Sequence, residues 1–327
     1  MDNLEEIKIL IETNYNLSVE KVSNITSKSL KVSTAQHEYV LKLAEGNDEF
    51  IMKQLFAYKS LPKNILPIYR TRDRQHLVPC RGQFFYLTDY VQIIAVPLEK
   101  QLYYYVELLN DLHEKTRLMT DISDEEISKI YNKEYKRLET SYSKLQKIME
   151  ACELKKDRSP YEWYFMMVYP MIYRMLQQAH EELKKFYDLL KRDHRMPISL
   201  SHGDVNVANV LISEKDTYLI NFEKSLFSLS SLDMYYLVEV YYQVPGMKSI
   251  ILDYVKNEKA AILRHYFFFK SLLVDLSELG ESLQDHSLIN IAVLNETLAP
   301  HLLAFQVYNE FNTPTTTTPT SPQGSST

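Results

Sequence analysis

The spacing of apolar residues changes repeatedly along the first 91 residues. Residues 4–14 carry apolar side chains at helical spacing, which predicts a short amphipathic helix, and residues 48–61 show the same spacing. Around these segments, apolar and polar residues alternate in short runs that predict antiparallel strands. These runs are 22–25, 29–33, 39–43, 76–78 and 83–88. We therefore expect an antiparallel sheet accompanied by one or two helices.

From residue 98 onward, helical spacing prevails. Ser123 and Glu126 have the spacing of a capping box, which marks the start of one long helix. Pro170 is expected to interrupt another, because proline cannot donate the helical hydrogen bond. The predicted helices are 98–116, the helix that opens at the capping box and runs to 153, 160–193, 230–242, and a helical region from 248 to about 311. Residues 312–327 are rich in Thr, Pro and Ser and predict a disordered tail.

A stripe of aromatic residues between Tyr161 and Tyr173 has two interpretations. Such a stripe at helical spacing is typical of a packed core. The alternative is that it lines the pocket for an acceptor molecule.

Composition excludes several classes of protein. The chain has 327 residues, 45% of them hydrophobic, which is typical of a globular protein with a substantial core. Its net charge of −6 argues against a general nucleic-acid partner, because phosphate backbones require a basic surface. Cys80 and Cys152 have neither disulfide-framework nor zinc-site spacing. The acidic start and the lack of an apolar run near ~20 residues indicate neither secretion nor a membrane partner.

The stretch 200–223 carries the candidate chemistry. His202, Asp204 and Asn209 have the spacing H-x-D-x-x-x-x-N in a polar loop. A β-branched and aromatic run, 217–222, follows and ends at the carboxylate of Glu223. A carboxylate can accept a hydroxyl proton, and an amide oxygen suits a hard cation such as Mg2+. If the run stays extended, side chains two residues apart share one side, so Glu223 would join Asn221.

This loop resembles the catalytic and metal-binding segments of the protein-kinase-like superfamily, in the H-G-D-x-x-x-x-N form of aminoglycoside phosphotransferases and choline kinases. Other segments match in the same order. They are Tyr39-Val40-Leu41-Lys42, similar to the strand with the phosphate-contacting lysine; the hinge at 87–91; Leu112-His113-Glu114-Lys115-Thr116, similar to L-H-x-x-T; and Asp233, similar to the carboxylate that braces the catalytic loop. Within the superfamily, the chain resembles the endospore coat-associated kinase-like proteins of the CotS/YutH type.

The resemblance implies an α+β, two-lobed protein-kinase-like fold. The N-lobe would span 1–91 and the mostly helical C-lobe 92–311. ATP and Mg2+ would be the cofactors, with Asp204 as the catalytic carboxylate and His202 as a structural residue. The implied metal ligands are Asn209, Asn221 and Glu223, and the implied nucleotide-binding residues are Lys42, Glu49, Asp89 and Val91. Glu49 would be the acidic partner of Lys42, and Lys42 and Asp204 would face one cleft. Taken alone, Lys42 and Glu49 also suit exposed surface positions, and His113 suits a packing role.

Two departures from the family pattern keep two functions open. The earliest glycine is Gly46, so no glycine-rich loop joins the first two strands, where Asn24 or Ser27 would have to serve. Asn221 stands where the family has aspartate. One hypothesis is an ATP- and Mg2+-dependent phosphotransferase acting on a small hydroxyl- or amine-bearing molecule. The other is a degenerate pseudokinase with a structural role. The resemblance further implies synthesis in the mother-cell cytoplasm, a place in the spore coat, and coat proteins as partners.

Overall fold

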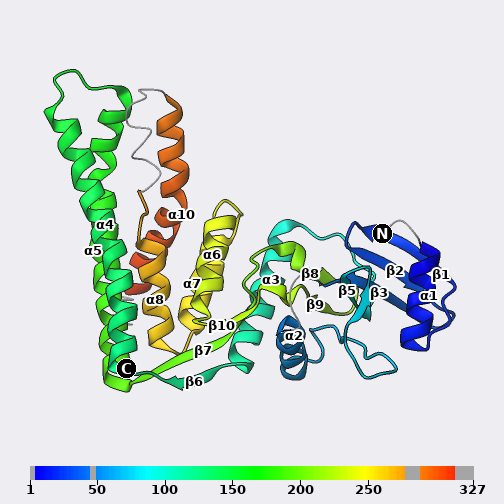
Figure 1. The fold of residues 1–327 in the computed structure, drawn as a ribbon. Coiled ribbons are helices and arrows are strands. Elements are labelled where there is room, and N and C mark those ends of the chain that lie inside the picture. Colours follow the sequence, from blue (N-terminus) through cyan, green and yellow to red (C-terminus); the bar gives the residue numbers. More distant parts are fainter. Residues whose placement is uncertain (1–3, 45–48, 277–287, 314–327) are drawn as a thin grey trace, which may run out of the picture.

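The computed structural model describes residues 4–44, 49–276 and 288–313 and shows an antiparallel sheet followed by a mostly helical part. Figure 1 shows the sheet at one end of an elongated molecule and a long pair of helices at the other. The α+β architecture is confirmed. Residues 314–327 lie outside the described residues, so the predicted tail stays a prediction, as does the part of the helical region at 277–287.

The N-terminal sheet has five strands in the order β1-β2-β3-β5-β4, all antiparallel. Its register places Lys42 between Ser29 and Tyr86 on the neighbouring strands. One face packs against α1 through Leu30, Leu41 and other buried residues. All five predicted strands and both predicted helices are present: α1 Leu4–Tyr15, β1 Lys21–Thr26, β2 Ser29–Ser33, β3 Glu38–Leu43, α2 Glu49–Ser60, β4 Val78–Cys80 and β5 Gln83–Asp89.

The C-terminal part consists of long helices together with a three-stranded and a two-stranded sheet. The helices are α3 Leu98–Lys115, α4 Asp124–Leu154, α5 Pro160–Asp193, α6 Ser231–Tyr241, α7 Met247–Asn257, α8 Ala261–Leu272 and α10 Leu288–Asn312. The strands are β6 Leu118–Asp121, β7 Arg195–Ser201, β8 Val210–Ile212, β9 Thr217–Leu219 and β10 Leu226–Ser228. β7 lies between β10 and β6, and β8 pairs with β9. The loop between β7 and β8 carries His202 and Asp204.

Helix α5 corrects one prediction. It continues without a break through Pro170, where we expected an interruption. A proline inside a helix costs about 3 kcal/mol. Apolar residues on both sides of it, among them Phe165, Ile172 and Leu176, are fully buried against the neighbouring helices. This burial offsets the lost hydrogen bond. The capping box at Ser123 and Glu126 is confirmed at the start of α4.

The aromatic stripe on α5 divides between core and surface. Tyr161 and Phe165 are buried, as the core interpretation predicts. Trp163 is 56% exposed, so the stripe is not one continuous core face. Cys80 and Cys152 are both free, as the sequence predicts.

Helix α10 differs from another expectation. By length and composition it could cross a membrane, whereas the sequence was expected to contain no such segment. About a third of its most apolar stretch is buried in this fold, where Leu294, Leu298 and Val307 belong to the main core. A core helix passes the same test of length and composition.

A buried carboxylate joins α5, α8 and α10. The Glu182 side chain is 2% exposed, and it receives hydrogen bonds from His265 at 2.6 Å, Lys185 at 2.7 Å and Tyr308 at 3.2 Å. Burial alone raises the pKa of Glu182, but the hydrogen bonds from His265 and Lys185 outweigh it, so the pKa is lowered overall. The carboxylate is therefore charged and fully partnered.

Replacing Glu182 by Gln is expected to lower the free energy of unfolding by about 1–3 kcal/mol at pH 7, because charged partners lose their acceptor. Since the folded pKa lies below the unfolded one, about 4.3, this contribution is complete above that pH and is lost as the pH falls through the folded pKa. Urea unfolding at pH 7 and pH 4 measures both effects. Glu181→Gln, on the exposed side of the same turn, is the control. Equal effects of the two substitutions would contradict the assigned role.

Candidate functional site

A cleft of about 530 Å3 lies between the N-terminal sheet and the loop after β7. This volume is within the range of small-molecule sites. Lys42 on β3, Asp204 on the loop and Asn221 beyond β9 all line it, although they are far apart in the sequence. The central expectation from the sequence, that Lys42 and Asp204 face one cleft, is therefore confirmed.

Hydrogen bonds to backbone carbonyls tie segments beyond β7 to residues within the first 94 of the chain. The amide of Leu219 donates to the carbonyl of Asn64 at 2.8 Å, and the amide of Ile94 donates to the carbonyl of Ile212 at 2.8 Å. Lys53 on α2 donates to the carbonyl of Ser225 at 2.8 Å. These bonds hold Leu219 and Ser225, which flank Asn221 and Glu223, against the N-terminal part of the chain.

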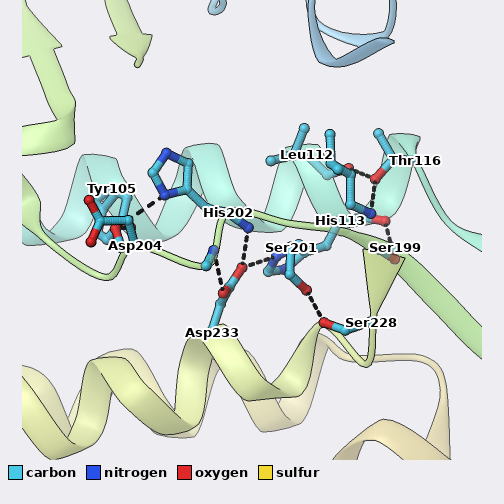
Figure 2. Close-up of polar contacts among 12 residues, drawn as sticks. Tyr105, Leu112, His113, Thr116, Ser199, Ser201, His202, Asp204, Ser228 and Asp233 are labelled. Carbon is cyan, nitrogen blue, oxygen red and sulfur yellow. Dashed lines mark hydrogen bonds and ion pairs between the residues drawn. The ribbon is translucent and has the colours of Figure 1, made fainter. Parts of the chain in front are cut away.

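The loop after β7 is held by the carboxylate of Asp233 on α6. Figure 2 shows this carboxylate accepting from the backbone amides of His202, at 2.8 Å, and Gly203, at 3.2 Å. The His113 ring, from α3, lies 2.9 Å from the same carboxylate. Burial by itself raises the pKa of Asp233, but the hydrogen bond from His113 and the nearby His202 outweigh it, so the pKa is lowered and the brace is an anion. Asp233 is structural, as predicted.

The L-H-x-x-T segment supports the end of β7, which leads into the same loop. The hydroxyl of Thr116 donates to the carbonyl of Leu112 at 2.6 Å and accepts from the amide of Leu200 at 3.0 Å (Figure 2). Ser199 donates to the carbonyl of His113 at 2.9 Å. His113 is thus a polar brace within a buried network, which is more than the packing role that the sequence indicated.

His202 has a structural role. Its side chain is buried, and its ring nitrogens lie 3.1 Å from the carbonyl oxygen of Asp204 and 2.8 Å from that of Ile220. Tyr105 packs edge-on against the ring and donates to the carbonyl of Asp204 at 3.0 Å. These contacts hold the backbone carbonyl of Asp204, and its side chain lines the cleft.

The strand predicted over 217–222 ends earlier, at Leu219. Asn221 has φ of 67°, the left-handed conformation that asparagine tolerates better than most residues, and Phe222–Lys224 form a 3-10 turn. The prediction that Glu223 shares one side of an extended strand with Asn221 is therefore wrong. The turn nevertheless keeps Glu223 in the cleft, where it accepts from the hydroxyl of Tyr86 at 3.3 Å.

Five side chains form a continuous hydrogen-bonded series across the floor of the cleft. Lys42 donates to Oδ1 of Asn221, and Nδ2 of Asn221 donates to Oδ1 of Asn209 at 2.6 Å. Nδ2 of Asn209 donates to Oδ2 of Asp204 at 3.2 Å. Oδ1 of Asp204 accepts from Lys224 at 2.8 Å. The structure thus brings together Lys42, Asn209, Asn221 and Asp204, as the sequence predicts.

The pKa of Asp204 is lowered. Partial burial raises it, but the hydrogen bonds from Lys224 and Asn209 outweigh that effect. The carboxylate is therefore ionised at neutral pH and can accept a hydrogen bond from a hydroxyl group. This is the state that a residue needs in order to orient an acceptor.

The other nucleotide-binding candidates occupy different surroundings. Asp89 and Val91 line the cleft, and Asp89 is fixed by hydrogen bonds from Tyr69 at 2.6 Å and His37 at 2.9 Å. Glu49 forms an ion pair with Lys53, one turn along α2, at 2.8 Å. Its proposed pairing with Lys42 stays a prediction.

Solved phosphotransferase structures are similar to this chain in overall fold. A spectinomycin phosphotransferase, solved with ADP and spectinomycin, has a TM-score of 0.50 and 14% identity, over 94% of this chain and 98% of its own. An aminoglycoside phosphotransferase from Alicyclobacillus acidocaldarius has a TM-score of 0.60 and 12% identity, over 95% of this chain and 97% of its own. No family profile and no curated protein sequence matches the chain.

This chain has the aminoglycoside phosphotransferase fold. The identities establish the fold alone, so the chemistry rests on the residues of the cleft.

In this phosphotransferase fold, a turn without glycine covers the cleft between β1 and β2. Lys28 and Ser29 line the cleft from this turn, together with Ile25 and Thr26. The hydroxyls of Thr26 and Ser29 are hydrogen-bonded to each other at 2.6 Å. From the sequence, Asn24 or Ser27 was expected in this role. Neither lines the cleft, but their neighbours Ile25, Thr26 and Lys28 do.

The residues fit a magnesium ion that arrives with a nucleotide. Within the described ranges, no three His, Cys, Asp or Glu side chains cluster as a metal site. Oxygen donors of Asn221, Asp204 and Glu223 line the cleft, and the buried side chain of Asn209 is hydrogen-bonded to Asn221. Mg2+ is normally bound by one or two carboxylates together with phosphate oxygens. Asp204 and Glu223 can provide the carboxylates, and the nucleotide provides the phosphate oxygens. Such an ion would supply positive charge over the phosphates.

Sequence reasoning missed two contributors to the site. Lys28 and Lys224 both line the cleft, and Lys224 contacts Asp204 directly. The only available signal was that Lys224 follows Asn221-Phe222-Glu223 without a gap. A lysine beside a motif is too common to be assigned from sequence.

Gly203 is expected to be intolerant of a side chain. Its φ is +74°, and a Cβ would lie 2.3 Å from the carbonyl oxygen of Lys224. Gly203→Ala should lower the free energy of unfolding by more than Gly82→Ala. Gly82 has φ of +76° with nothing within 4 Å of a Cβ, so it isolates the backbone strain of about 1–2 kcal/mol. Thermal unfolding compares the two, and equal losses would show that the loop does not need this close approach.

Proposed function

We propose that this protein is an ATP- and Mg2+-dependent phosphotransferase that acts on a small hydroxyl- or amine-bearing molecule. The observation that carries the proposal is the series from Lys42 to Asp204 across one cleft. Phosphoryl transfer needs cations over the phosphates and a carboxylate near the acceptor proton, held in fixed geometry. Lys42 at one end of the series supplies the cation, and Asp204, next to Lys224 at the other end, supplies the carboxylate.

Each residue of the cleft has a role in this proposal. Lys42 contacts the α and β phosphates, and the segment containing Asp89 and Val91 meets the adenine. Asn209 and Glu223 hold Mg2+ with the phosphate oxygens. Asp204, which is ionised and held by its backbone, orients the acceptor and takes its proton.

The aminoglycoside phosphotransferase fold supports an acceptor of the same general class, a polar molecule with several hydroxyl and amino groups. The superposed enzyme was solved with spectinomycin and ADP. Aminoglycosides and smaller amino alcohols are therefore the first acceptors to test. The C-lobe helices beside Asp204 would form the acceptor side.

A second candidate is a pseudokinase that serves as a structural protein. Asn221 favours it, because an amide in place of the usual metal carboxylate weakens Mg2+ binding. The sequence resemblance to CotS/YutH-type proteins would then place the chain in the spore coat, after synthesis in the mother-cell cytoplasm, with coat proteins as partners. Both the coat location and these partners rest on the resemblance.

Asp204→Asn is expected to lower phosphoryl transfer ~10²- to 10⁴-fold, because the amide cannot accept the acceptor proton. The assay follows phosphate from ATP onto aminoglycosides and amino alcohols. Asp216→Asn, at an exposed turn, is the control. Retained turnover in Asp204→Asn would remove Asp204 from its assigned role.

ATP with Mg2+ is expected to raise the melting temperature. A ligand at 100 times its dissociation constant stabilises the folded state by about 2.7 kcal/mol. Differential scanning fluorimetry with ATP, with ATP and Mg2+, and with neither measures the shift. A melting temperature that does not change when nucleotide is added would favour the structural role over the phosphotransferase.

A further inference from the structure

Lys224 lies beside the carboxylate that carries the proposed chemistry. Its Nζ is 2.8 Å from Oδ1 of Asp204, and its side chain lines the same cleft as Lys42. The close approach of Gly203 to the Lys224 carbonyl fixes this neighbourhood through the backbone. A cation is therefore held where the acceptor and the transferred phosphate would meet.

The two asparagines at the metal position are bonded to each other. Nδ2 of Asn221 points at Oδ1 of Asn209, 2.6 Å away, while Oδ1 of Asn221 accepts from Lys42. An aspartate at position 221 would place oxygen against oxygen here, and a cation would be needed between them. The amide N–H of Asn221 makes this contact without a metal ion and leaves the second lone pair of Asn209 Oδ1 available to Mg2+. It also removes one negative charge from the floor.

The charges of the floor change accordingly. Lys42 and Lys224 are cationic, and Asp204 and Glu223 are anionic, so these four groups sum to zero. With aspartate at position 221 the sum would be negative, and metal ions would have to supply more of the positive charge over the phosphates. Phosphoryl transfer depends on such charge near the transferred group. Lys224 is the cation nearest to Asp204 in the part of the chain that the structure describes.

We propose that Lys224 binds the terminal phosphate of ATP and positions it toward Asp204. Its positive charge takes the place of charge that metal ions bound by a carboxylate at position 221 would supply. This inference rests on the proposed phosphotransferase function. In the transfer, the bond from Pγ to the ADP oxygen breaks and the bond from the acceptor oxygen to Pγ forms. The acceptor proton passes to Asp204, and Lys224 keeps its own.

The test measures nucleotide affinity without turnover, by calorimetry with ATP and with AMP, each in EDTA and in Mg2+. The variants are Lys224→Met, which removes the charge, and Lys224→Arg, which keeps it. Lys215→Met, on the exposed turn between β8 and β9, is the matched control. AMP lacks the terminal phosphate, so it reports on the adenine and α-phosphate contacts alone.

Lys224→Met is expected to weaken ATP binding in EDTA about tenfold, the loss of one charge-assisted hydrogen bond. AMP binding should stay within twofold, Lys224→Arg should recover most of the ATP affinity, and Lys215→Met should match the unsubstituted protein. Equal ATP affinities of Lys224→Met and the unsubstituted protein would overturn the inference alone. So would equal weakening for ATP and AMP, which marks a structural effect. If the unsubstituted protein binds neither nucleotide, the proposed function fails as well.

Discussion

The buried carboxylate of Asp233 is the constraint on which the site depends. It is an anion enclosed by protein, and it accepts from two consecutive backbone amides of the catalytic loop while it faces the ring of His113. A buried charge with these partners can occupy only one arrangement, because each missing partner would leave uncompensated charge at low dielectric. Helices α3 and α6 and the loop after β7 are therefore locked to one another.

Everything on the floor of the cleft follows from that lock. With Gly203 pulled toward Asp233, the loop approaches the carbonyl of Lys224 so closely that only glycine fits. The same approach sets Asp204 beside Lys224, and Asn209 beside Asn221. A rigid backbone thus determines which polar groups meet, and the side chains lose little further conformational entropy in holding their geometry.

The amide of Asn221, where the family pattern has a carboxylate, has two consequences. It removes charge from the metal position, which is the argument for a degenerate site. The same amide donates to Asn209 and accepts from Lys42, so the polar groups of the floor are satisfied by each other. Asparagine and aspartate both tolerate the left-handed backbone at this position better than most residues do.

The sequence by itself determined the strands and helices of residues 4–89, the long helices beyond residue 98 and the five-residue spacing between Asp204 and Asn209, because periodicity and motif spacing are local properties of the chain. The brace at Asp233 was implied only by the family resemblance, and β6, β7, β8 and β10 were not predicted. The sequence could not determine that α5 runs through Pro170, or that the strand stops at Leu219, since burial against other helices and a left-handed residue decide these points. Lys28 and Lys224 joined the site only through folding. Which side chains meet across a cleft depends on contacts between distant segments, and those are set by the tertiary structure alone.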